Sequence, residues 1–487
     1  MKQESEKNFR QSLGFFDSTM LVVGSMIGSG IFIVSADISR TLGSPMYMLL
    51  TWIVTGVITI IAALSYGELA AMMPRAGGQY VYLKESYNPM VGFLYGWTLF
   101  MIIQTGTIAA VAVAFAKFTG VLLPVFSEKN ILLEINNYKI SAAQLLAILS
   151  LVILTFINYF GIKNGKIMQI TFTITKILAL AGIIIAGLVV ATGSGFWAGN
   201  FSDMWSASKT VMEEGKIVDI YKLGGLGLLT AFGVSMVGSL FSSDAWNNVT
   251  FIAGEIKNPK RNIPLSLFWG VLIVTAIYLL CNIAYLSLLP MNGNPEAADV
   301  VGRGIKFATS DRVGVAAASQ IFGESAAIIM AVLIMISTFG CNNGLILSGA
   351  RVYYAMANDG LFFKGVSKLN KYAVPGVALI FQCIWASVLC LSGKYGDLLD
   401  YVISAVLIFY ILTIAGVFIL RKKRPDAERP YKAFGYPVLP AIYIVIALAI
   451  CIDLLIYKRD YCLPGFMIVL AGIPIYYLLV NRKQKDT

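Results

Sequence analysis

The chain has 487 residues, of which 58% are hydrophobic and 13% charged, and its mean hydropathy is +0.77. Soluble domains carry about 25% charged residues, so the composition excludes a soluble globular protein and indicates one embedded in lipid. The net charge of +11 comes from short Lys and Arg clusters between apolar runs, not from one basic stripe. We therefore do not expect nucleic-acid binding.

The apolar residues fall into about twelve windows of about 20 residues, the helical length that crosses a hydrocarbon core of roughly 30 Å. Ten-residue units of alternating polarity, which would indicate a membrane β-barrel, are absent. We predict an all-α integral membrane protein, in which the loops 192–225 and 290–322 are polar connections. The predicted spans are 14–38, 46–72, 90–122, 140–159, 167–191, 226–253, 265–289, 323–357, 374–393, 398–420, 436–457 and 463–481.

Lys and Arg residues concentrate in the loops on one side of these spans, for example in the run 421–424. By the positive-inside rule, this predicts a multi-pass protein of the cell inner (plasma) membrane with both termini in the cytoplasm. We expect no cleavable signal peptide before the first span. The six cysteines lack metal-ligand spacing and are expected to be free thiols, so we predict neither a metal site nor a cofactor.

Two spans are interrupted by small polar residues in a similar way. The first contains Gly24-Ser-Met-Ile-Gly-Ser-Gly30, and the sixth contains Val234-Ser-Met-Val-Gly-Ser239 followed by Leu-Phe-Ser-Ser-Asp-Ala-Trp246. Interrupted helices at corresponding places in two halves are typical of transporters built from inverted repeats. We predict a segment 1–13, a first five-helix repeat 14–191, a second repeat 226–420, two additional helices within 436–481 and a tail 482–487.

In the first span, Gly28, Ser29 and Gly30 weaken the α-helix and free backbone amides that attract a carboxylate. The carbonyls of Met26 and Ile27 are candidate acceptors for a substrate ammonium. The alternative is that Gly24 and Gly28 only allow close helix packing.

In the sixth span, Ser242, Ser243 and Asp244 need a polar cavity, because an acid at a helix centre costs about 2.5–3.5 kcal/mol. Asp244 is expected to cap or structurally bond the second half-helix, to contact the substrate or to carry a proton. Phe241 and Trp246 flank the break and are candidate gates. The alternative for both aromatic residues is ordinary packing.

Lys176 lies deep in the fifth span, too far from its end to reach the surface easily. One interpretation is that its ammonium replaces a sodium ion and ties the first span to Ser337 or Thr338, and the other is a purely structural cation. Near the inner surface, Glu68 and Glu255 are expected to form ion pairs. The basic residues close to them in sequence are Arg75, Lys257, Lys260 and Arg261.

At these residues the sequence resembles the amino acid/polyamine/organocation (APC) superfamily, and within it a prokaryotic member of the L-amino acid transporter (LAT) family. The resemblance runs from about residue 13 to 480. Its motifs are Gly24-Ser-Met-Ile-Gly-Ser-Gly-Ile-Phe32, Tyr66-Gly-Glu-Leu69 with Gly77-Gly-Gln-Tyr80, Glu255-Ile-Lys-Asn-Pro-Lys-Arg-Asn-Ile-Pro264, and Ser348-Gly-Ala-Arg351 with Asp359-Gly360.

The resemblance implies a five-plus-five inverted-repeat (LeuT-like) fold with two extra helices. It implies that the amides of Ser29 and Gly30 hold an amino acid carboxylate, and that the carbonyls of Met26, Phe241 and Ser242 hold its amine. Lys176 matches the lysine that replaces a sodium ion in sodium-independent relatives. Because the loop 123–139 lacks the cysteine of the animal members, no disulfide-linked heavy-chain partner is expected. The oligomeric state is not predicted.

The leading hypothesis is a sodium-independent transporter of L-amino acids, a neutral amino acid antiporter that works by alternating access, and not an enzyme. One alternative is a proton-coupled importer of cationic amino acids or polyamines that uses Asp244, because many relatives have a small residue there. Another is a membrane sensor that binds an amino acid without moving it.

Overall fold

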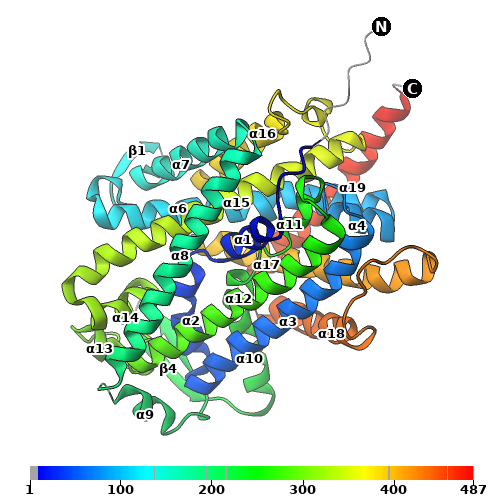
Figure 1. The fold of residues 1–487 in the computed structure, drawn as a ribbon. Helices are drawn as coiled ribbons and strands as arrows, with labels where there is room; N and C mark the ends of the chain where they lie inside the picture. Colours follow the sequence, from blue (N-terminus) through cyan, green and yellow to red (C-terminus); the bar gives the residue numbers. More distant parts are fainter. Residues whose placement is uncertain are drawn as a thin grey trace.

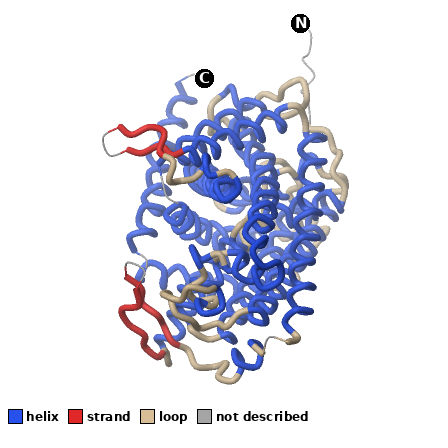
Figure 2. The backbone as a smooth tube through the Cα atoms, turned by 90° about the vertical axis from the view of Figure 1, so that its left-hand side faces the viewer, coloured by secondary structure: helices blue, strands red, loops and turns tan. Residues whose placement is uncertain are grey.

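The computed structural model describes residues 9–135, 138–193, 195–213, 216–392, 395–457 and 459–485. Residues 1–8 of the predicted segment 1–13 and residues 486–487 of the predicted tail lie outside this range. The described strands form two antiparallel hairpins, β1 (Ile131–Ile135) with β2 (Tyr138–Ser141) and β3 (Ser208–Glu213) with β4 (Lys216–Lys222). Figure 2 shows both hairpins at the periphery of a helical body.

Ten described helical segments are long and apolar enough to cross a membrane. They are α3 (Pro45–Met72), α5 (Pro89–Thr98) continued by η2 (Leu99–Ile103) and α6 (Gln104–Leu122), α7 (Ala142–Tyr159), α8 (Ile162–Ala191), α10 (Gly225–Ser242), α12 (Pro259–Leu288), α14 (Val313–Phe322) continued by η6 (Gly323–Ser325) and α15 (Ala326–Asn358), α17 (Tyr395–Lys423), α18 (Val438–Tyr457) and α19 (Arg459–Lys485). Two shorter apolar helices, α1 (Phe15–Met26) and α16 (Gly376–Ser392), join them. The all-α multi-pass prediction is confirmed, while a count of twelve spans depends on including these two.

The remaining helices are short and lie between or beside the spans. They are η1 (Gly30–Phe32), α2 (Val34–Leu42), α4 (Gln79–Ser86), η3 (Pro124–Phe126), α9 (Phe196–Phe201), α11 (Asn248–Phe251), η4 (Ala253–Glu255), α13 (Val300–Arg303), η5 (Thr309–Asp311) and η7 (Lys364–Ser367). The predicted loops 192–225 and 290–322 therefore contain structure: α9 and β3–β4 in one, α13 and α14 in the other. The helices α9 and α13 and the β3–β4 hairpin are too short to produce an apolar window of spanning length, whereas α14 extends the span of α15 at its start.

Capping side chains, each followed by a proline, mark the first residues of two spans. Ser44 Oγ accepts a hydrogen bond from Tyr47 N at 3.3 Å, and Asn88 Oδ1 accepts one from Val91 N at 3.0 Å. A proline follows each of these residues, at a position where its missing amide costs nothing. The starts of α3 and α5 are thus set locally, within one residue of the predicted boundaries.

The interior of the bundle is packed through small residues. Helix α1 lies near the centre of the bundle, against α8, α12 and α15 (Figure 1). A Cβ at Gly270 of α12 would lie 2.4 Å from Val22 Cγ1, and a Cβ at Gly56 of α3 would lie 2.1 Å from Thr275 Cγ2. These glycines let the backbones of α12, α1 and α3 approach closely, as is common where helices meet inside a membrane.

The two faces of the bundle can be told apart by contacts between distant segments. On the face that we call the N-terminal face, the amides of Ser12 and Leu13 donate to Glu255 O, and Lys257 N donates to Leu13 O. The opposite face carries α9 and the β3–β4 hairpin. In Figure 1, α9 and β4 lie at the lower end of the view, and α4 and α19 lie toward the upper right.

Candidate functional site

The first span is interrupted where the sequence predicted. Helix α1 ends at Met26, Ile27 is extended at φ −74° and ψ 97°, and η1 begins at Gly30 before α2 continues. Among the described residues, the amides of Gly28 and Gly30 donate no hydrogen bond to the protein. The break thus presents backbone donors inside the bundle.

The sixth span is interrupted in the same way. Helix α10 ends at Ser242, the backbone turns through Ala245 at φ +65°, and α11 begins at Asn248. The break therefore spans 243–247, which includes the predicted Ser243, Asp244 and Trp246.

The two breaks are in direct contact. A Cβ added at Gly30 would lie 2.0 Å from Ser242 Oγ and 3.3 Å from Ser242 Cα, so only glycine fits there without moving the neighbouring backbone. A Cβ at Gly28 would meet only Cys341 Sγ, at 3.7 Å, which is an ordinary contact. A Cβ at Gly24 would collide with Gln169 and Thr173 of α8. The close-packing interpretation therefore holds for Gly24 but not for Gly28.

A tyrosine that the sequence analysis missed joins the two breaks. The hydroxyl of Tyr278, on α12, lies 3.1 Å from Met26 O and 2.9 Å from Ser242 O, and the side chain is fully buried. Its single hydrogen lies within bonding distance of two carbonyls that the resemblance assigned to a substrate amine. A tyrosine in an apolar span carries no sequence signal that separates it from a packing residue.

Lys176 on α8 ties the first break to α15. Its Nζ donates to Gly24 O at 2.7 Å, Ile27 O at 2.7 Å and Ser337 O at 3.1 Å. Ser337 Oγ lies 3.1 Å from Ile27 O and 3.3 Å from Gly28 O. The predicted link to Ser337 is thus present, whereas the hydroxyl of Thr338 bonds within α15, to Ile334 O at 2.7 Å.

Asp244 bonds across the bundle and does not cap α11. Its Oδ1 accepts a hydrogen bond of 2.5 Å from the hydroxyl of Tyr410 on α17, while α11 begins without a side-chain cap. Of the three expectations for Asp244, capping is therefore not observed, and structural bonding is.

The aromatic residues beside this break differ in exposure. Trp246 is fully buried and packs edge to face on Tyr66, with ring centroids 4.8 Å apart, and lies 5.2 Å from the ring of Tyr410. Phe241, at the last turn of α10, is half-buried. Of the two candidate gates, Phe241 is thus the more exposed, whereas Trp246 packs against the rings of Tyr66 and Tyr410.

A small polar cavity of about 20 Å³ lies between the sixth-span break and α6 and α17. Its polar lining consists of Gln79, Tyr95, Gln104, Thr107, Asp244, Asn247, Asn248 and Tyr410. This volume holds about one water molecule. An amino acid side chain enters only if the surrounding helices move.

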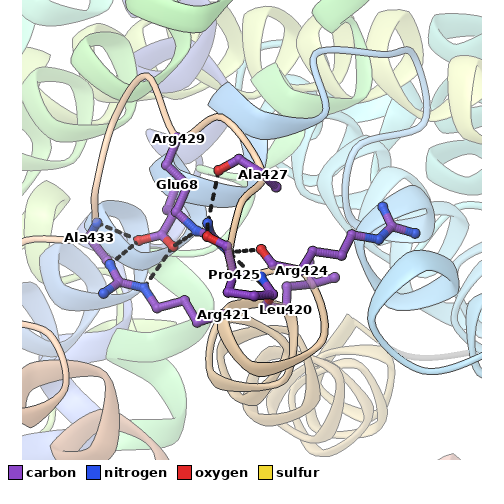
Figure 3. A network of polar contacts seen from close by, with 8 residues as sticks. All are labelled: Glu68, Leu420, Arg421, Arg424, Pro425, Ala427, Arg429 and Ala433. Carbon is purple, nitrogen blue, oxygen red and sulfur yellow. Dashed lines mark hydrogen bonds and ion pairs between the residues drawn. The ribbon is translucent and has the colours of Figure 1, made fainter.

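Buried ion pairs lie toward the N-terminal face, but their partners differ from those expected. Glu255 pairs with Arg351 at 3.0 Å, and both side chains are buried. Glu68 accepts from Arg421 Nε at 2.9 Å and Nη2 at 2.6 Å, and from Ala433 N at 2.7 Å, while Arg429 Nε lies 3.4 Å away (Figure 3). The expected pairing with basic residues nearby in sequence is wrong. The observed partners Arg351 and Arg421 belong to distant segments that helix packing places beside the two glutamates.

Two interrupted helices that meet inside a multi-pass bundle define the class of protein as a secondary membrane transporter. Comparison with known families agrees: the family described as "Amino acid permease" matches residues 13–480. The chain belongs to this family, which is part of the APC superfamily.

Individual relatives match over nearly the whole chain. The "Serine/threonine exchanger SteT" of Bacillus subtilis (strain 168) is 28% identical over 481 residues, which are 98% of this chain and 99% of that one. The human "Large neutral amino acids transporter small subunit 2" is 29% identical, over 98% of this chain and 82% of its own length. The human "b(0,+)-type amino acid transporter 1" is 26% identical, over 98% and 89%.

Proposed function

We propose that this chain is a sodium-independent exchanger of neutral L-amino acids that works by alternating access. The observation that carries the proposal is the contact between the two helix breaks at Gly30 and Ser242, which gathers free amides and helix-end carbonyls at one point. Relatives named for serine/threonine exchange and for large neutral amino acids support the choice of substrate. A transporter with this site needs no catalytic residue, and we propose no enzymatic activity.

The backbone recognises the head group of the substrate. The amides of Gly28, Ser29 and Gly30 begin a new helical turn, whose positive end attracts the carboxylate. The carbonyls of Met26, Phe241 and Ser242 lie at the negative ends of α1 and α10 and attract the ammonium. Ile27 O already accepts from Lys176 Nζ and Ser337 Oγ, so it has no position left for the substrate. A carbonyl oxygen has two lone pairs, so the hydrogen bond from Tyr278 leaves one position on Met26 and Ser242 for the substrate.

The ammonium of Lys176 supports independence from sodium. Its Nζ donates to Gly24 O, Ile27 O and Ser337 O, the type of oxygen cluster that holds a cation beside an interrupted helix. A sodium ion at this position would meet the repulsion of Lys176. Thr338 has no part in this proposal.

The polar cavity beside Asp244 is the proposed site for the substrate side chain. Amide and hydroxyl groups from Gln79, Gln104 and Thr107 line it and suit a small or neutral polar side chain. Asp244 forms its boundary at the break, Ser243 lies beside Asp244 but does not line the cavity, and Phe241 is the proposed gate. Trp246 supports the wall of the cavity through its ring contacts.

We also propose the orientation and the organisation of the chain. The N-terminal face, which carries the basic linker 424–437, is the cytoplasmic face of the plasma membrane. Residues 14–191 and 226–420 are the two inverted repeats, and 436–481 contains the two additional helices. The loop 123–139 has no cysteine, so we expect transport without a disulfide-linked partner.

Purified protein in proteoliposomes tests the exchange mechanism. Labelled serine or leucine is offered outside, with or without unlabelled amino acid inside, in sodium or choline buffer. We expect uptake that depends on internal amino acid and is the same in both buffers. Uptake that requires a sodium gradient and ignores internal amino acid would refute the proposal.

A second candidate function is proton-coupled import of cationic amino acids or polyamines, which the position of the Asp244 carboxylate at the break and beside the cavity favours. This function requires that Asp244 gain and lose a proton or pair with a cationic substrate. Uptake of labelled lysine and serine by wild type and Asp244→Asn, measured from pH 5 to 8, separates the two functions. If the wild type takes up lysine and the variant loses both this uptake and its pH dependence, the second function replaces the first.

A further inference from the structure

An open groove of about 980 Å³ lies on the outside of the bundle, next to the N-terminal face. Its two long walls are α3 and α12, and the linker 424–437 closes one end. The exposed side chains Val57 of α3, Leu265 of α12 and Phe434 of the linker make the groove apolar. It is separate from the helix breaks and takes no part in the proposed transport path.

The end of the groove at the N-terminal face is basic. Lys260, Arg261 and Lys432 line it, and all three are exposed. Lys260 pairs with the exposed carboxylate of Glu428 at 3.0 Å. Within the part of the chain that the structure describes, the side chains of Arg261 and Lys432 make no ion pair or hydrogen bond. The mouth of the groove thus has two positive charges that are not neutralised.

The dimensions of the groove match one leaflet of a membrane. From Lys260 to Phe268 the helix axis of α12 advances about 12 Å at 1.5 Å per residue. Half of a hydrocarbon core is about 15 Å thick. A chain lying along the groove therefore spans most of one leaflet, with its polar end beside Arg261 and Lys432.

The wall that the linker forms is held in place. A Cβ at Gly67 of α3 would lie 2.9 Å from the ring of Tyr431, so this ring is seated directly on α3. Two residues further, Ala433 N donates to the buried carboxylate of Glu68 at 2.7 Å. The groove is therefore formed before any ligand arrives, which lowers the entropic cost of binding.

We propose that this groove binds an anionic phospholipid, with an acyl chain between α3 and α12 and the phosphate between Arg261 and Lys432. Charge complementarity selects the headgroup, because basic pockets at the ends of membrane helices favour anionic lipids. The apolar walls select a lipid over a soluble phosphate compound. A zwitterionic lipid fills the same walls but leaves the basic charges without a net negative partner.

Native mass spectrometry of delipidated protein, titrated with phosphatidylglycerol or phosphatidylcholine, tests the proposal. We expect the wild type to bind at least one phosphatidylglycerol in preference to phosphatidylcholine. Arg261→Gln with Lys432→Gln lowers phosphatidylglycerol binding by about 25-fold, since each basic residue contributes roughly fivefold. The control pair Lys368→Gln with Lys422→Gln removes the same charge from exposed positions outside the groove and leaves binding unchanged.

A second pair of variants tests the apolar part of the groove. Val57→Trp fills it and lowers the binding of both lipids, while Val152→Trp, at a position of equal exposure on α7, does not. Glycerol phosphate, which has no acyl chain, should not compete. The proposal is overturned if the Arg261/Lys432 variant binds phosphatidylglycerol like the wild type, if the control pair loses as much, or if glycerol phosphate displaces the lipid.

Discussion

Gly30 and Ser242 form a close contact between the two interrupted spans. Residue 30 has no room for a Cβ, since Oγ and Cβ of Ser242 already lie 2.0 and 2.8 Å from where that atom would be. Gly28 lies two residues earlier in the same break and has ordinary space around it. Glycine at position 30 is thus needed because a side chain does not fit there, whereas glycine at position 28 contributes only backbone flexibility.

We predict that Gly30→Ala destabilises the protein by about 1–3 kcal/mol and abolishes uptake, because overpacking forces the two breaks apart. Gly28→Ala adds the same methyl group in open space and should unfold close to the wild-type temperature. Thermal unfolding in detergent and uptake by proteoliposomes measure the two effects. Equal unfolding temperatures for both variants would contradict the close contact at Gly30.

The side chain of Lys176 joins the first helix break to α15. Lys176→Met removes the donor for three buried carbonyls, each costing about 1–3 kcal/mol if no other donor replaces it. We predict that uptake falls at least about tenfold. Lys117→Met, which removes the same group from a partly exposed position, should transport normally. Comparable loss in both variants would mean that positive charge in general, not the position of Lys176, supports transport.

At the scale of elements, Glu68 fastens three segments to one another. Its carboxylate at the end of α3 binds Arg421 of α17 and, in the linker 424–437, Arg429 and the backbone of Ala433 (Figure 3). The Glu68 side chain is 1% exposed, so its bonds are little screened by solvent. The linker is therefore attached to the bundle at its middle as well as at its two ends.

We predict that Glu68→Gln destabilises the protein by about 3–5 kcal/mol, the usual cost of removing one partner from a buried ion pair. The linker should also become more sensitive to trypsin at Arg429 and Lys432. The control Glu428→Gln makes the same change in the exposed pair with Lys260 and should cost less than about 1 kcal/mol. Limited proteolysis that is the same for both variants would show that Glu68 does not hold the linker.

The spans and their breaks were predictable from sequence, whereas most side-chain partners were not. Windows of apolar residues gave α3 and α5 within a residue or so, and Gly28 to Gly30 marked the first break, because both signals are local. Tyr278, Tyr410 and Arg351 were missed as partners, since each meets its partner through helix packing between distant segments. Glu68 and Glu255 form ion pairs as expected, but their partners Arg421 and Arg351 were not predicted, for the same reason.

At the scale of the whole molecule, the proposed orientation depends on charge asymmetry alone and is open to a direct test. In a background without the native cysteines, Ser206→Cys lies beside β3, and Lys368→Cys follows η7 on the N-terminal face. We predict that a membrane-impermeant maleimide labels residue 206 in intact cells and residue 368 only after permeabilisation. The reverse pattern would place both predicted cytoplasmic ends outside the cell.

The contact between Gly30 and Ser242 also has a genetic consequence. Because Ser242 Oγ and Cβ occupy much of the space that a residue 30 side chain would need, a harmful change at position 30 should be suppressed by a smaller residue at position 242. Gly30→Ala combined with Ser242→Gly is then fitter than Gly30→Ala alone. Positions 30 and 242 are 212 residues apart in the chain, yet they would change as a pair. Selection for growth on an amino acid would recover the two substitutions together.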